Sequence, residues 1–134
     1  MRLKKFTDNA FRVLIFAANH QDRLVNITEI AETCDIPRNH LTKVIHTMSK
    51  QGLLETIRGK GGGVRLSRPA KDITVGSVVR LMEGDSDIVE CFQPRCPIVP
   101  VCKLRSILNQ GHNALLSSLE DHTLADIVGD GIEF

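Results

Sequence analysis

The sequence predicts a mainly α-helical fold that carries one small β-hairpin. Two short amphipathic segments joined by a tight turn occupy residues 27–50, and a glycine-rich stretch flanked by short apolar runs follows at 53–66. Leucine and isoleucine then recur at three- and four-residue spacing between 103 and 119. The first and third patterns are typical of helices, and the second is typical of a hairpin. We therefore expect helices on both sides of a single hairpin.

The first helix is expected to begin at Thr7, whose hydroxyl suits the N-cap position, with Asp8 in its first turn. It should end near Asn19. One face of this helix is apolar and should lie against the core: Ala10, Val13, Leu14, Ala17 and Ala18.

Two short helices are expected next, the first capped by Thr28 and ending near Asp35. The second opens with Pro37, because proline suits the first turn of a helix, and ends before Gly52. The first should bury Ile30, Ala31 and Cys34, and the second Leu41, Val44, Ile45 and Met48. Two short helices joined by a tight turn form a helix-turn-helix, whose second helix enters the DNA major groove.

A cationic β-hairpin should follow, with strands at 53–58 and 64–66 around the glycine-rich tip at 59–63. A hairpin directly after a helix-turn-helix is the wing of a winged-helix domain. A nucleotide phosphate loop is the alternative, but the required spacing is absent and no helix begins at Lys60.

The residues expected to contact DNA lie on the second helix and on the wing. Polar and cationic side chains at the start of a recognition helix reach base edges or phosphates, and an arginine beside glycines is slim enough to enter a narrow minor groove. The candidates are Arg38, Asn39, His40, Lys43, Arg58, Lys60 and Arg65. A solvent-exposed charged helix face remains the simpler interpretation of each residue taken alone.

Thr74 is expected to cap a further helix that ends at Gly84, with Val75, Val78, Val79 and Met82 facing inward. An acidic run follows, consisting of Glu83, Asp85, Asp87 and Glu90. Carboxylates close to thiolates raise the local negative charge unless a cation lies between them. This run therefore favours a bound metal in the segment after it.

Three of the four cysteines, Cys91, Cys96 and Cys102, lie within twelve residues that also contain three prolines. So many prolines exclude a continuous helix or a central strand. Zinc sites usually use shorter gaps between paired cysteines, whereas iron–sulfur clusters are bound by thiolates at looser spacings. A cluster needs four ligands, so a carboxylate, a histidine or another chain must supply the fourth. Buried free cysteines and a disulfide are the alternatives.

Charge is distributed unevenly along the chain. Residues 1–82 carry 14 Lys and Arg against 7 Asp and Glu, whereas residues 83–134 carry 3 against 9. A basic first half of net charge +7 favours a polyanionic partner, and the second half of net charge −6 must serve another purpose.

No apolar run is long enough to span a membrane, and no signal peptide follows the basic first residues. We expect a cytoplasmic protein, whose cysteines stay reduced.

The long helix expected at 103–119 presents an apolar stripe of Leu104, Ile107, Leu108, Leu115, Leu116 and Leu119. Such a stripe beyond the winged-helix unit needs a cover, and a second copy of the chain in a two-fold dimer is the simplest one. The helix folding back onto its own domain is the alternative. A last helix is expected at 123–128, with a frayed end at 129–131. The expected units are thus a DNA-binding domain (1–82), a cluster-binding loop (83–102) and the dimerisation and C-terminal helices (103–134).

Taken together, these features resemble the iron–sulfur winged-helix transcription repressors of bacteria over about residues 1–128. The resemblance is carried by the wing from Arg58 to Leu66, the cysteine triad and the dimerisation helix. The start of the recognition helix, Arg38-Asn39-His40, and the gaps of four and five residues between cysteines resemble the nitric-oxide-sensitive branch. The resemblance also extends to Phe6-Thr7-Asp8 and to the residues 123–126.

The resemblance implies that Cys91, Cys96 and Cys102 ligate a [4Fe–4S] or [2Fe–2S] cluster. Some members supply an aspartate near the N-terminus of the partner subunit as the fourth ligand, and Asp8 occupies the matching position. Other members use a histidine after the third cysteine, but His112 lies too far along its helix for that role.

The function implied is that of a homodimeric repressor that binds a palindromic DNA operator and senses nitric oxide through its cluster. No residue stands out as a nucleophile with a paired base, so we do not expect an enzyme. An iron-availability or redox sensor of the same family is an alternative. A zinc-stabilised binding module, or an electron-transfer protein or cluster scaffold, is the alternative from another class.

Overall fold

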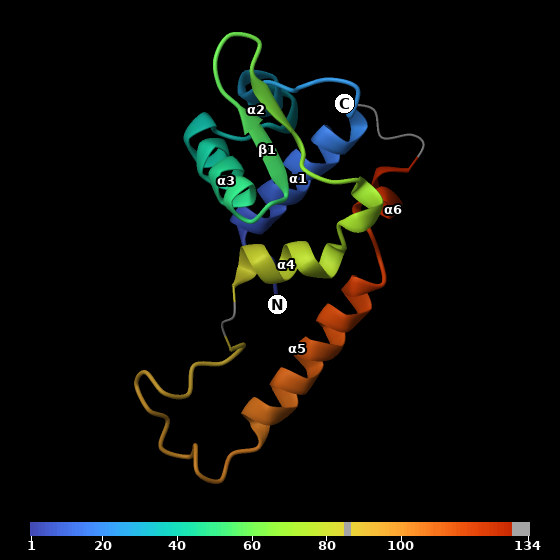
Figure 1. Cartoon of the computed structure of the whole chain (residues 1–134). Helices are drawn as coiled ribbons and strands as arrows, with labels where there is room; N and C mark the ends of the chain where they lie inside the picture. Colours follow the sequence, from blue (N-terminus) through green and yellow to red (C-terminus); the bar gives the residue numbers. More distant parts are fainter. Residues whose placement is uncertain (85–86, 130–134) are drawn as a thin grey trace.

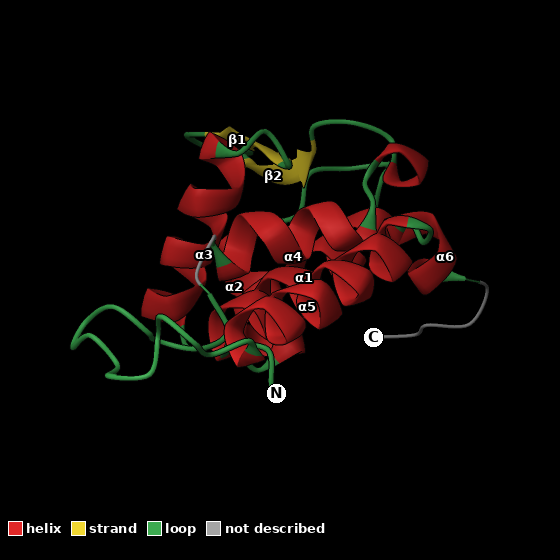
Figure 2. Ribbon diagram, turned by 90° about the horizontal axis from the view of Figure 1, so that it is seen from below, coloured by secondary structure: helices red, strands yellow, loops and turns green. Residues whose placement is uncertain are grey.

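The computed structural model describes residues 1–84 and 87–129 (Figure 1). Within that part of the chain the elements follow in the order α1 (Lys5–Asn19), α2 (Ile27–Cys34), α3 (Arg38–Lys50), β1 (Leu54–Ile57), β2 (Gly63–Leu66), the 3-10 helix η1 (Ala70–Asp72), α4 (Val75–Glu83), α5 (Leu104–Glu120) and α6 (Leu124–Val128). The predicted mainly helical fold with one hairpin is confirmed. Figure 2 shows the hairpin at one edge of the packed helices.

Helix α1 is the centre of the core and packs against α2, α3, α4, α6 and β2. All five residues of its predicted apolar face are buried. Phe16 joins them at 2 % exposure, although its position lies outside that predicted stripe. Burying a side chain of this size stabilises the fold by about 1.5–3 kcal/mol. A core built around α1 therefore fixes the directions in which its polar face and the surrounding helices point.

The two predicted caps at Thr7 and Thr28 are wrong, because each helix begins earlier. The backbone N–H groups of Thr7 and Asp8 both donate to the carbonyl of Lys4, so α1 begins at Lys5 and the Thr7 side chain is fully buried. Helix α2 is capped by Asn26, whose side-chain oxygen accepts a hydrogen bond from the Glu29 backbone N–H at 2.8 Å. Asparagine caps a helix as well as threonine does, so sequence preference could not separate the two positions.

The hairpin pairs β1 with β2 in antiparallel register from Leu54 opposite Leu66 to Ile57 opposite Gly63. Val25 extends this small sheet by exchanging two backbone hydrogen bonds with Val64, at 3.0 and 2.8 Å. The close approach requires glycine at position 63, since a Cβ atom there would lie 2.5 Å from the Val25 carbonyl oxygen. The base of the wing is thereby joined to the loop between α1 and α2.

Helix α4 begins where predicted, with the Thr74 hydroxyl accepting a hydrogen bond from the Ser77 backbone N–H at 3.1 Å. Gly84 ends it with a φ of 81°. Helix α5 approaches α4 so closely that a Cβ atom on Gly76 would lie 2.8 Å from the Glu120 backbone nitrogen. Thr74 also donates to the Glu120 carboxylate at 2.6 Å. These contacts attach the C-terminal end of α5 to the globular body.

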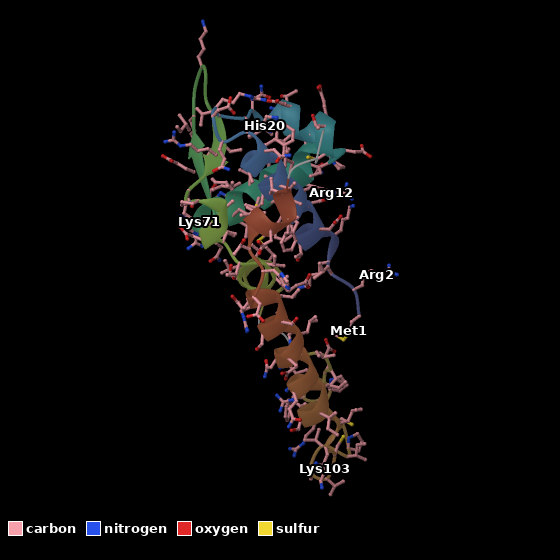
Figure 3. The ribbon with its side chains drawn as sticks, turned by 90° about the vertical axis from the view of Figure 1, so that its right-hand side faces the viewer. Met1, Arg2, Arg12, His20, Lys71 and Lys103 are labelled. Carbon is pink, nitrogen blue, oxygen red and sulfur yellow. The ribbon has the colours of Figure 1, made fainter. Side chains whose placement is uncertain are left out.

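The rest of α5 extends away from that body, and the cysteine-rich loop lies at its far end (Figures 1 and 3). Of its apolar stripe only Leu116 is buried, whereas Leu104, Ile107 and Leu115 are 54 %, 61 % and 46 % exposed. Folding back onto the same chain, the alternative raised by the sequence, therefore does not cover this stripe. No described helix has both the length and the apolarity required to cross a membrane.

The predicted last helix is α6, which Thr123 caps through a capping box with Asp126. The Asp126 carboxylate accepts a hydrogen bond from the Thr123 backbone N–H at 2.8 Å, which lowers the pKa of that carboxyl. The expected frayed end extends to residues 130 and 131, which lie outside the described residues.

Candidate DNA-binding surface and cysteine pocket

The start of α3 presents its polar residues to solvent. Leu41, Val44 and other apolar residues on the opposite face of α3 are fully buried, which fixes the rotation of the helix about its axis. All four predicted residues here, Arg38, Asn39, His40 and Lys43, are consequently exposed. The Arg38 guanidinium donates to the Thr28 hydroxyl of α2 at 2.6 Å, so it also joins the two helices. This arrangement is the one in which a recognition helix offers its first turn to DNA.

The wing residues differ in how free they are. Arg58 and Lys60 lie exposed at the tip of the hairpin. Arg65 instead lies directly opposite Glu55 in the strand register, and its guanidinium contacts that carboxylate at 2.9 Å. The hydrogen bond raises the pKa of Arg65 and lowers that of Glu55. A phosphate would have to compete with Glu55 for Arg65, so Arg58 and Lys60 are the better-placed cations.

A broad hollow of about 940 Å³ separates the recognition helix from the wing, with part of α2 as its floor. Thr42, His46 and Ser49 line it from α3, and sequence reasoning did not single out these residues. The signal was available, because positions 38, 42, 46 and 49 recur at helical spacing on one polar face. The Ser49 and Thr56 hydroxyls share a hydrogen bond of 2.8 Å, which joins the end of α3 to β1.

The cysteine-rich segment contains no regular helix or strand between residues 87 and 103, as the prolines predict. Backbone turns hold it instead. The Cys96 N–H donates to the Cys91 carbonyl at 2.9 Å, and the Cys102 N–H donates to the Ile98 carbonyl at 2.9 Å. These turns bend the chain repeatedly within the twelve residues that hold the three cysteines. Asp85, part of the predicted acidic run, lies outside the described residues.

Cys91, Cys96 and Cys102 all line one hollow of about 380 Å³. All three are unpaired and half-buried, so no disulfide forms among them. The remaining wall comes from the polar side of α5 and consists of Arg105, Ser106, Asn109, Gln110 and Asn113, with Phe92 and Val99 from the loop. Cys34 is separate from this site. Its thiol is in the core at 7 % exposure, and burial raises its pKa, as expected for a structural cysteine.

The donor set of this hollow consists of three cysteines, whose thiolates are ligands of iron–sulfur clusters and of zinc. Among residues 1–84 and 87–129, no three His, Cys, Asp or Glu side chains lie close enough together to hold one metal ion. A zinc ion needs its ligand atoms within about 2.0–2.3 Å of a single point. Cysteine thiolates around a shared hollow would fit an iron–sulfur cluster.

Arg105 is a cation in this hollow that sequence reasoning did not identify. Its guanidinium contacts the Asp87 carboxylate at 2.7 Å and lies over the Phe92 ring, 5.0 Å from the ring centroid. The Asp87 hydrogen bond raises the pKa of Arg105, and the nearby Cys91 thiol adds to that effect. The sequence feature that could have identified Arg105 is its position in the first helical turn after the last cysteine. Arg105 therefore holds the loop against α5 and supplies positive charge beside the thiols.

Asp8 lies in the first turn of α1, a helix of the globular body (Figure 1), and is not among the residues that line the cysteine hollow of its own chain. One oxygen of its carboxylate contacts both Lys5 and Arg12, each at 3.1 Å. Arg12 in turn donates to the Cys34 carbonyl at 3.1 Å. The structure of one chain therefore brings together the three predicted thiol ligands but not the predicted fourth ligand.

The whole chain is similar in sequence to known bacterial regulators. Residues 3–130 match the Rrf2 family, described as iron-dependent transcriptional regulators. The chain is 48 % identical over 132 residues to the HTH-type transcriptional regulator NsrR of Bacillus subtilis, a match that covers 96 % of this chain and 90 % of the relative. It is 43 % identical to NsrR of Oceanobacillus iheyensis, with the same two coverages.

Two solved structures share the fold. One is CymR of B. subtilis, the global cysteine regulator, with a TM-score of 0.75, 23 % identity and 96 % of each chain covered. The other is IscR of T. potens, with a TM-score of 0.76, 23 % identity, and 96 % of this chain and 86 % of that chain covered. At this identity the likeness shows the arrangement of helices and hairpin.

Proposed function

Because this chain belongs to the Rrf2 family of transcriptional regulators, which are not enzymes, we propose that it is a homodimeric DNA-binding repressor that senses nitric oxide through an iron–sulfur cluster. The observation that carries the cluster is the single hollow lined by Cys91, Cys96 and Cys102. The observation that carries DNA binding is the exposed start of α3 beside a cationic wing. The identity of 48 % to a regulator named NsrR supports the nitric-oxide branch.

The exposed stripe on α5 supports the dimer. Leu104, Ile107 and Leu115 leave apolar surface in water on a helix that extends beyond the globular body. A two-fold partner covers the stripe with its own copy, which is self-complementary by symmetry. The same pairing can bring the cysteine loop of one chain toward α1 of the other, where Asp8 lies. The partner subunit is therefore the source we propose for the fourth ligand.

When bound, an iron–sulfur cluster supplies iron atoms to which nitric oxide binds. The residues of the chain couple that site to DNA affinity. The thiolates of Cys91, Cys96 and Cys102 would hold the group, and Asp8 would supply an oxygen ligand, which binds iron less firmly than a thiolate does. The cysteine loop leads directly into α5, so a change in its ligation alters the dimer contact. Operator half-sites are about 34 Å apart, so a small shift of the two α3 helices weakens binding.

Anaerobic titration of the cluster-loaded protein with nitric oxide tests this proposal, with affinity for a palindromic operator as the readout. We expect affinity to fall in step with the loss of the cluster absorbance. The cluster-free chain keeps all four thiols, so it is the control for direct thiol chemistry and should not respond. Unchanged operator affinity after complete reaction of the cluster would contradict nitric-oxide sensing.

An iron-availability sensor is a second candidate, favoured by the description of the family as iron-dependent. In that case cluster occupancy itself controls the DNA affinity. For an iron-availability sensor, removal of iron by a chelator would change operator binding as strongly as nitric oxide does. A dedicated nitric-oxide sensor should instead respond to nitric oxide at concentrations that leave the iron content of the protein unchanged.

Ligation across the dimer can be tested with a heterodimer of one Asp8→Ala chain and one Cys96→Ala chain. If Asp8 ligates the partner's cluster, one site in this heterodimer keeps three cysteines and an aspartate. The other site lacks Cys96 and the aspartate. We expect half the wild-type cluster absorbance, with wild-type persistence in air. If Asp8 ligates within its own chain, neither site is complete, and the remaining cluster should decay at the faster rate of the Asp8→Ala homodimer.

A further inference from the structure

A small cationic hollow lies between the N-terminal ends of α1 and α3. It measures about 180 Å³ and is lined by Lys5, Phe6, Asn9, His40 and Lys43. Lys5, His40 and Lys43 are exposed, and no carboxylate is among the described residues that line the hollow. The three side chains come from two helices that the core packs together, so the cluster does not depend on a single flexible segment.

Asn9 is the one buried residue among those that line this hollow. Its side chain lines the hollow but is only 3 % exposed, and its Oδ1 atom is buried without a hydrogen-bond partner in the described chain. A side-chain amide carries an N–H₂ donor group beside its oxygen, and a half-turn of the amide exchanges the two. A buried amide oxygen without a partner is costly, and only after that half-turn, with the N–H₂ group in its place, would an anion in the hollow supply the missing partner.

The position of the hollow selects the anion. It adjoins the first turn of α3, the part of a recognition helix that enters the major groove. Sugar-phosphate backbones border that groove on both sides, so cations beside the helix start meet phosphates and not base edges. We propose that Lys5, His40, Lys43 and Asn9 bind one backbone phosphate of duplex DNA, and that Asp8 competes with this phosphate for Lys5.

The competition follows from the ion pair on α1. The Lys5 ammonium lies 3.1 Å from the Asp8 carboxylate, which also accepts from Arg12. Lys5 therefore has two mutually exclusive partners, the Asp8 carboxylate and the phosphate. The link to sensing rests on the proposed function. While Asp8 ligates the partner's cluster, Lys5 is free to bind DNA. When the cluster is lost, the Asp8 carboxylate pairs with Lys5 again.

Salt-dependent binding of the full-length, cluster-free chain to a duplex of unrelated sequence tests the site without the cluster. Lys43→Gln should lower the salt slope by about one unit and the affinity roughly eightfold at 0.1 M salt, the value of one counterion-release term. Lys5→Gln should have the same effect in an Asp8→Asn chain, where no carboxylate holds the lysine. Asp8→Asn should raise the affinity, and that gain should vanish in the double variant Asp8→Asn with Lys5→Gln.

The control variants are Lys71→Gln and Asp72→Asn, which make the same charge changes in η1 beside α6, on the side of the domain away from α3 (Figure 1). If Lys43→Gln, and Lys5→Gln in the Asp8→Asn chain, behave like Lys71→Gln, the phosphate site is wrong. If Asp8→Asn behaves like Asp72→Asn in a chain that keeps Lys5, the competition is wrong. The proposed function then still stands, provided that operator binding depends on Asn39 and Arg58. If the cluster-loaded wild-type chain binds no duplex at all, both proposals are wrong.

Discussion

Replacing Cys96 with alanine is expected to abolish the visible absorbance of the protein completely. Cys96 is one of three free thiols around the hollow at the far end of α5, and the other residues that line the hollow offer no replacement thiolate. Loss of one ligand from a cluster held by three thiolates and one oxygen leaves two firm attachments. The same result is expected for Cys91→Ala and Cys102→Ala, measured by absorbance and by iron content after anaerobic purification.

Cys34→Ala is the matched control for this prediction. The Cys34 thiol is buried in the core among residues of α1 and α2, and its raised pKa disfavours the thiolate that binds metal. We expect this variant to keep its colour and iron content. A colourless Cys34→Ala protein, together with normal absorbance in the triad variants, would contradict the assignment of the cluster to residues 91–102.

Replacing Asn39 with alanine is expected to weaken binding to the preferred operator by about 1–3 kcal/mol, the value of one base-reading contact, which is roughly 5- to 150-fold. Asn39 is exposed in the first turn of α3, and its amide can both donate to and accept from a base edge. Binding to unrelated duplexes should change little, because a base contact contributes only where the base is present. The ratio of specific to non-specific affinity measured at one salt concentration checks this.

Lys60→Gln is the contrasting variant. Lys60 lies at the tip of the wing and is placed to contact phosphates, so its loss should weaken binding to all sequences alike and lower the salt slope by about one unit. Equal losses on specific and unrelated duplexes for both Asn39→Ala and Lys60→Gln would mean that α3 does not read bases. Arg58→Ala should reduce affinity mainly for operators with an A·T-rich flank, since a narrow minor groove attracts an inserted arginine.

Much of the fold follows from local sequence patterns. The apolar stripes of α1, α3 and α4, the cap at Thr74 and the glycines that end helices or form the wing tip each act within a few residues. The N-caps predicted at Thr7 and Thr28 are wrong, although they rest on the same residue preference that correctly predicted the other caps. Several residues near a helix start can accept a backbone hydrogen bond, and the packing of Thr7 into the core decides which one does.

The sequence by itself also determined the chemistry of both candidate sites. Residue type and spacing indicated three thiols in a proline-rich loop and a cationic face on α3 with a glycine-rich wing. Ligand chemistry depends on the atoms of a side chain, and those are present in the sequence before folding.

Only the tertiary structure decided which of these residues share a surface. It placed Arg105 beside the thiols, paired Arg65 with Glu55, and brought Lys5 to the hollow beside Lys43. It also left the α5 stripe exposed and Asp8 outside the lining of the cysteine hollow of its own chain. Such relations depend on how helices far apart in sequence pack around α1, and packing is a property of the whole core that no local pattern contains.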